Sequence, residues 1–153
     1  MSTSHPVTAT ERLALIRLGL PRVWIALSAI LAASAVALGA YAAHGLERSL
    51  IERGFDSVKI AEKLDQTNTA VQYHAAHAIA MLAIAASCYL RRSRWAGAAA
   101  WMWLVGILLF SGGLYSLAIF DRMGHWAIVP AGGLCFIIGW LCLAISAMTA
   151  RDV

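Results

Sequence analysis

Histidine and tyrosine side chains gather near the ends of long uncharged stretches, and they are the residues of this sequence best suited to chemistry. His44 closes the first stretch, and Tyr73, His74 and His77 lie near the start of the second. His74 and His77 are three residues apart, so on a helix they project from one face about one turn apart. With His44 on a neighbouring helix, these imidazoles could give a metal three nitrogen ligands or bind haem.

Two hydroxyl side chains, Ser111 and Tyr115, are expected at the same level as the histidines, near the outer surface of a membrane. The alternative is structural, because such histidines can bond a backbone carbonyl or a tyrosine hydroxyl. Ser111 lies in a glycine-rich stretch, but serine beside glycine in a membrane helix usually serves packing, so we assign no catalytic residue. The sequence leaves the cofactor unknown. The candidate ligand-binding residues are His44, Tyr73, His74, His77, Ser111 and Tyr115, and the three histidines are the candidate metal ligands.

Four stretches that contain no Asp, Glu, Lys or Arg must position these residues. Each exceeds the roughly 18–20 apolar residues that cross a bilayer as a helix. The chain is 61% hydrophobic and 13% charged, whereas soluble domains average about 25% charged residues. We therefore predict an all-α, polytopic membrane protein with four transmembrane helices in an up-down-up-down bundle. Its predicted parts are an N-terminal segment (1–22) and a transmembrane domain (23–150), with helices at about 23–44, 69–90, 95–120 and 123–150 and an outer loop at 46–68.

Basic residues are distributed unequally between the two sides of this predicted bundle. Seven of the twelve lie in the N-terminal segment, the 91–94 connection and the C-terminus, while the five on the other side are mixed with six acidic residues. The positive-inside rule therefore places both termini in the cytoplasm. The first apolar run is longer than the core of a signal peptide, so we expect it to be retained. Because the basic residues lie at helix ends, we expect the lipid bilayer, and no nucleic acid, as a partner.

Small residues at helical spacing predict where the helices touch, because membrane helices associate through close packing at such positions. Steps of three and four residues connect small side chains over 28–42 in the first helix, 76–87 in the second and 132–149 in the fourth. The glycines expected at helix contacts are Gly39, Gly106, Gly113, Gly132, Gly133 and Gly139.

The predicted outer loop contains a further helical pattern. Asp56 or Ser57 can cap a helix start, and Val58, Ala61 and Leu64 then recur every three residues. This spacing predicts a short amphipathic helix that lies at the outer interface and covers the mouth of the bundle with its apolar face.

Each predicted helix carries one short motif of glycine, aromatic and polar residues. The motifs are GAYAAHGL at 39–46, AVQYHAAHA at 70–78, FSGGLY at 110–115 and PAGGL at 130–134, the last followed by Gly139-Trp140. In this order they resemble the YgdD-like family of small four-helix bacterial inner-membrane proteins. The family is a domain of unknown function, so the resemblance implies fold, topology and location but no reaction.

We therefore expect a structural or accessory subunit, or an interaction protein, of the inner membrane, assembled as a homo-oligomer or within a larger complex. This expectation rests on the small size of the chain, on spans without charge and on small-residue faces. The alternative is a membrane protein that binds a small ligand, a metal or haem through an outer cluster of histidine and tyrosine.

Overall fold

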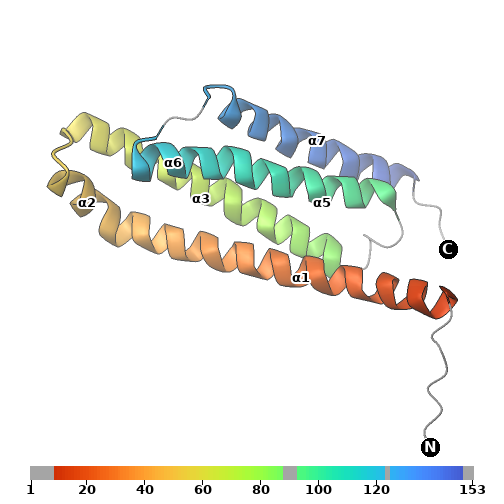
Figure 1. The fold of residues 1–153 in the computed structure, drawn as a ribbon. Helices are drawn as coiled ribbons and strands as arrows, with labels where there is room; N and C mark the ends of the chain where they lie inside the picture. Colours follow the sequence, from red (N-terminus) through yellow and green to blue (C-terminus); the bar gives the residue numbers. More distant parts are fainter. Residues whose placement is uncertain (1–8, 88–92, 123–124, 150–153) are drawn as a thin grey trace, which may run out of the picture.

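The described part of the chain is helical apart from short connections. The computed structural model describes residues 9–87, 93–122 and 125–149, with side chains from residue 22 onward, and contains no strand there. The all-α class is confirmed. The helices of the described residues form four rods, which lie side by side (Figure 1). The first comprises α1 (Ala9–Tyr41), the π-helical turn η1 (Ala42–Leu46) and α2 (Glu47–Glu52); the second is α3 (Ser57–Ala86); the third comprises α5 (Arg94–Gly106), the π-helical turn η2 (Ile107–Ser111) and α6 (Gly112–Phe120); and the fourth is α7 (Ile128–Thr149).

Three segments of the described chain are long and apolar enough to cross a membrane. The remaining rod, α3, is also long, with 30 residues, but its apolar half carries Gln72, Tyr73, His74 and His77. Polar side chains are costly in a bilayer unless they face the protein interior. The packing of α3 therefore decides how these residues are shielded. The three apolar segments are Arg22–Glu52, Arg94–Phe120 and Ile128–Thr149.

Residues 46–68, predicted as an outer loop with a short interfacial helix, instead form most of a helical hairpin. Helix continues without a break through α1, η1 and α2 to Glu52, and α3 already begins at Ser57. Gly54 makes the turn between them with a φ of 81°, a conformation that glycine adopts without steric cost. The Asp56 side chain then accepts a hydrogen bond of 2.9 Å from the backbone nitrogen of Lys59, which caps α3 as predicted.

One face of α3 is buried along its whole length and contains polar as well as apolar side chains. The faces predicted from the sequence are different, because Ala76, Ala83 and Ser87 of the small-residue stripe are exposed, as is Val58 of the predicted amphipathic helix. Alanine packs against lipid or protein equally well, whereas histidine and lysine must be hidden from lipid. The polar residues therefore determine which face turns inward. The buried residues follow the alternating steps of a coiled-coil seam: Ile60, Lys63, Thr67, Ala70, His74, His77, Met81 and Ile84.

The central pair of rods consists of α3 and the α5–η2–α6 rod, which pack on each other. α1 packs chiefly on α3, and α7 packs chiefly on α5 and η2. Among the described residues, contacts between α1 and α7 are scarce, and these two helices lie at opposite edges in Figure 1. The rods therefore do not close into a ring, and α1 and α7 each keep an uncovered face. The main apolar core includes Trp24, Met81, Trp103, Ile107 and Phe136.

Glycines mark the closest approaches between rods. A β-carbon on Gly132 would meet the backbone nitrogen of Phe110 in η2, and one on Gly106 or Gly139 would overlap an aromatic ring of the facing helix. The neighbouring Gly133 is different, because its β-carbon would lie 3.7 Å from the nearest atom of the Phe110 ring. Only one glycine of the 132–133 pair therefore lies against a neighbouring backbone.

Candidate functional site

His77 is the most fully bonded side chain of the candidate cluster. Its Nδ1 lies 2.8 Å from the carbonyl oxygen of Tyr73, and its Nε2 lies 3.1 Å from the indole Nε1 of Trp140. Because an indole N–H can only donate, Nε2 must accept, and Nδ1 must carry the proton that is donated to the carbonyl. The imidazole is therefore neutral with both nitrogens engaged, and no lone pair is left for a metal.

Aromatic rings from three rods surround this imidazole. The Phe136 ring of α7 stacks on His77, with centroids 3.7 Å apart and planes inclined by 11°. The Tyr73 ring lies 5.9 Å from that of Phe136 and 4.9 Å from that of Phe110 in η2. The sequence analysis singled out Tyr73 and His77 but missed the phenylalanines, because apolar rings far away in the chain carry no signal of their own.

The His77 cluster lies near the middle of the helices rather than near their outer ends. Trp140, which bonds His77, is twelve residues from the start of α7 and nine from its end, which corresponds to about 18 Å and about 13 Å. The hydrocarbon core of a bilayer is about 30 Å thick. α3 begins twelve residues earlier than predicted, and the expected position of His77 near the outer surface of a membrane stays a prediction.

A groove of about 570 Å³ lies beside the His77 cluster, between α3 and α7 with η2 at its floor. Most of its wall is aromatic or aliphatic. Its lining residues are Tyr73, His77, Phe110, Pro130, Gly133, Leu134, Phe136, Ile137 and Trp140.

His74 belongs to a second, buried polar group at the interface of α3 with η2 and α6. Its Nδ1 lies 3.4 Å from the hydroxyl oxygen of Tyr115. His74 is 5% exposed and Ser111 is fully buried, and within the described residues His74 Nε2 and Ser111 Oγ have no hydrogen-bond partner. Ser111 ends the π-helical turn η2, a type of turn that occurs frequently at functional sites.

His44 lies apart from the other candidate residues. It is exposed in η1, on the first rod. Among the residues that the structure describes, no three His, Cys, Asp or Glu side chains are grouped so that they could hold a metal. The three-histidine metal site expected from the sequence therefore does not form there, because His44 is exposed on the first rod whereas His74 and His77 are buried against other rods.

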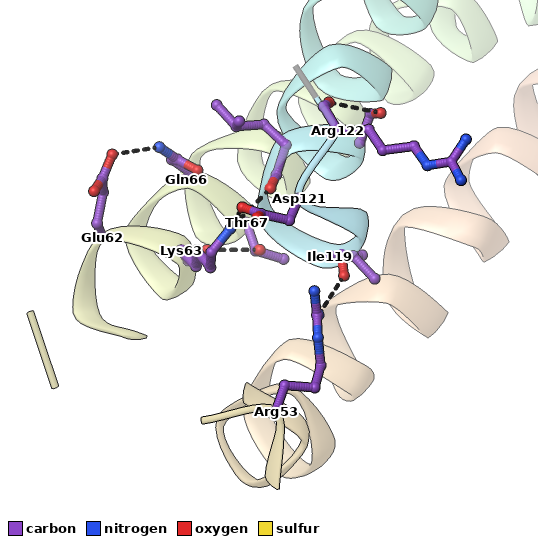
Figure 2. Close-up of polar contacts among 10 residues, drawn as sticks. Arg53, Glu62, Lys63, Gln66, Thr67, Ile119, Asp121 and Arg122 are labelled. Atoms are coloured by element: carbon purple, nitrogen blue, oxygen red, sulfur yellow. Dashed lines mark hydrogen bonds and ion pairs between the residues drawn. The ribbon is translucent and has the colours of Figure 1, made fainter. Parts of the chain in front are cut away.

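Lys63 forms a polar site that the sequence analysis missed. This buried lysine donates to the Asp121 carboxylate at 2.6 Å and to the Leu117 carbonyl at 3.1 Å (Figure 2). Arg53 donates to the Ile119 carbonyl at 2.7 Å, and both cations lie against the Phe55 ring. Cations thus satisfy the last carbonyls of α6 and hold the α2–α3 hairpin on that helix end. The position of Lys63 on the alternating stripe of α3 is the sequence signal that could have revealed it.

Asp121 completes this contact from the end of α6. Its backbone has the left-handed φ of 55°, which an aspartate tolerates better than most residues. The hydrogen bond and the charge of Lys63 lower the pKa of the Asp121 carboxyl group. The carboxylate is therefore the favoured form while the hairpin is docked.

Comparison with known proteins identifies relatives of this chain. The family described as "Protein of unknown function (DUF423)" matches residues 38–133. The UPF0382 membrane protein of Haemophilus influenzae is 41% identical over 77% of this chain and 87% of its own length. YwdK of Bacillus subtilis, a UPF0382 membrane protein, is 39% identical over 83% and 97%. The UPF0382 inner membrane protein YgdD of Escherichia coli is 33% identical over 76% and 82%. No solved structure matches the chain.

The matched region contains the end of the first rod from residue 38, all of α3 and of the α5–η2–α6 rod, and only the first six residues of α7. It includes His44, the Tyr73–His77 segment, Ser111 and Tyr115 from the candidate cluster. The names of these relatives state a membrane location and no activity. The chain therefore belongs to the UPF0382 (DUF423) family of membrane proteins, whose function is unknown.

Proposed function

We propose that this protein spans the inner membrane four times, with both termini in the cytoplasm, and serves as a structural or accessory subunit of a larger membrane assembly. Burial of the polar stripe supports α3 as the fourth span, because His74 and His77 face protein rather than lipid. The asymmetric distribution of arginine supports the orientation. The name of the E. coli relative supports the choice of membrane.

The proposal of a partner rests on the uncovered face of α1. This face is a continuous stripe of small side chains with steps of three and four, and His44 lies at its outer end. A different small-residue stripe on α1, which includes Ser28 and Ala35, is buried. Exposed alanines in a membrane helix permit close approach of another helix backbone, and His44 could bond a polar group of that partner. The exposed stripe consists of Ala26, Ala29, Ala33, Ala37, Ala40 and His44.

Site-specific photocrosslinking in native membranes tests this proposal. A photoreactive amino acid at Ala33, in the centre of the stripe, should give one discrete protein adduct. The same residue at Ile79, which is 60% exposed on the outward face of α3, is the control and should label lipid alone. The adduct mass distinguishes a second copy from another subunit. Absence of any protein adduct at Ala33 would contradict the proposed role.

Cysteine accessibility tests the proposed orientation. Cys88, Cys135 and Cys142 are first replaced by alanine, and single cysteines then replace Ser57 or Ser93, which lie at opposite ends of the molecule. In intact cells an impermeant thiol reagent should label Ser57→Cys and leave Ser93→Cys unlabelled until the cells are opened. The opposite labelling pattern would reverse the orientation.

A further inference from the structure

The groove between α3 and α7 extends along α7 from Pro130, near the start of that helix, to Trp140, about 18 Å from that start. Its lining is apolar apart from Tyr73, His77 and Trp140. With α3 as the proposed fourth span, on which this inference rests, the groove faces the hydrocarbon core of the bilayer. The lining therefore favours an occupant that dissolves in lipid.

The shape of the lining argues against a transmembrane helix as the occupant. Close helix packing in a membrane needs small residues, but large side chains project at this groove. Leu134 is 60% exposed, Ile137 is 59% exposed and Trp140 is 48% exposed. A thinner molecule can lie between these side chains, whereas a helix backbone would be held away from the floor.

The chemistry of the lining favours a flat ring with a hydrogen-bond acceptor. Tyr73, Phe136 and Trp140 are aromatic residues that line the groove, and aromatic rings attract one another in stacked and edge-to-face arrangements. His77 and Trp140 satisfy each other. The hydroxyl of Tyr73 makes no hydrogen bond within the described part of the chain, although the residue lines the groove. In hydrocarbon an unpaired hydroxyl is unfavourable, and a carbonyl oxygen would satisfy it.

We propose that this groove binds a membrane-soluble molecule with a carbonyl-bearing flat ring and an apolar tail, the chemistry of an isoprenoid quinone. The ring lies on the aromatic floor formed by Phe110 and Phe136, and its carbonyl oxygen accepts a hydrogen bond from the Tyr73 hydroxyl. The tail leaves the groove past Leu134 into the bilayer. An acyl chain of a phospholipid has neither the flat face nor the acceptor at this depth. The site lies on α3 and α7, away from the exposed stripe of α1, so the two proposals can fail separately.

Photolabelling of the purified full-length protein in lipid nanodiscs tests the site. The probe is a radiolabelled azidoquinone with a short alkyl tail, and an unlabelled decylquinone is the competitor. We expect saturable labelling of peptides that contain residues 73–77 or 133–140. Tyr73→Phe, which removes one oxygen and keeps the ring, should weaken binding about threefold to tenfold, the loss of one hydrogen bond.

A pair of glycine substitutions provides the matched control. Gly133→Leu places a side chain in the groove and should weaken binding at least about tenfold, because the ring and the new side chain compete for one volume. Gly97→Leu adds the same side chain where a β-carbon meets no atom within 4 Å, and binding should be unchanged. Circular dichroism and thermal unfolding verify that the variants are folded. If Gly133→Leu does not fold, Tyr73→Phe still tests the proposal.

Three results would overturn the proposal. The first is labelling that the decylquinone cannot compete away. The second is equal binding by the wild-type protein and folded Tyr73→Phe. The third is competition by a phosphatidylglycerol of matched tail length as effective as that by the quinone, which would show an ordinary lipid contact.

Discussion

Substitution of Gly132 by alanine should destabilise the protein, whereas the same change at Gly133 should not. The added β-carbon at Gly132 would meet the Phe110 backbone nitrogen and would lie 2.9 Å from the Leu109 carbonyl carbon. Carbon atoms in contact prefer about 3.5–4.0 Å, and a backbone cannot rotate away as a side chain does. α7 must therefore move outward from η2. Overpacking of this kind costs about 1–3 kcal/mol.

The adjacent glycine isolates this packing cost. Both substitutions gain the helix propensity of alanine over glycine, about 1 kcal/mol, so that gain cancels when the two variants are compared. At Gly133 the new β-carbon lies 3.7 Å from the Phe110 ring, an ordinary contact. We therefore expect Gly132→Ala to be less stable than Gly133→Ala by about 1–3 kcal/mol.

Reversible unfolding in mixed detergent micelles, followed by circular dichroism, measures this difference. The comparison needs both variants under one set of conditions, because absolute stabilities in detergent vary with the micelle. Equal stability of the two variants, or lower stability of Gly133→Ala, would refute the close approach of α7 to η2. It would also remove the reason why the Phe110 side chain forms the floor of the groove.

Two further predictions concern the hydrogen bonds that connect the rods. In a double-mutant cycle on His77→Phe and Trp140→Phe, the unfolding free energies should show a coupling of about 0.6–1.7 kcal/mol, the range of membrane hydrogen bonds, and additive effects would exclude the bond of 3.1 Å. For Asp121, Lys63 lowers the carboxyl pKa in the folded state. The contribution of the Lys63–Asp121 ion pair to stability is therefore full above the unfolded pKa near 3.9, and it is lost as pH falls through the folded pKa. The difference in melting temperature between wild type and Asp121→Asn should therefore be present at pH 7 and shrink in acid below about pH 4, and a difference independent of pH would refute the ion pair.

Much of the local structure could be predicted from the order of residues. Uncharged stretches longer than a bilayer specify helices, because no other open structure satisfies backbone groups in lipid. The Asp56 cap could also be predicted from local sequence, since its side chain bonds a backbone nitrogen three residues away. These properties depend on neighbours within a few residues, so the sequence contains all the information that they need.

Contacts between rods could not be predicted from the sequence in the same way. Lys63 appeared to belong to a charged outer loop, and only the end of α6 shows why this lysine is buried. Similarly, the positions of His44 and His77 in their helices suggested one shared site. In the structure, however, the first rod exposes His44 and α3 buries His77.

What the sequence by itself determined is therefore the helical class, the four rods and the polar residues that needed shielding. What only the tertiary structure decided is which side chains meet: His77 with Trp140, Lys63 with Asp121, and Gly132 with the backbone of η2. The physical reason is that an alanine-rich membrane helix has several faces of similar packing quality. Contacts between residues on different rods, rather than local propensity, select the face that is buried.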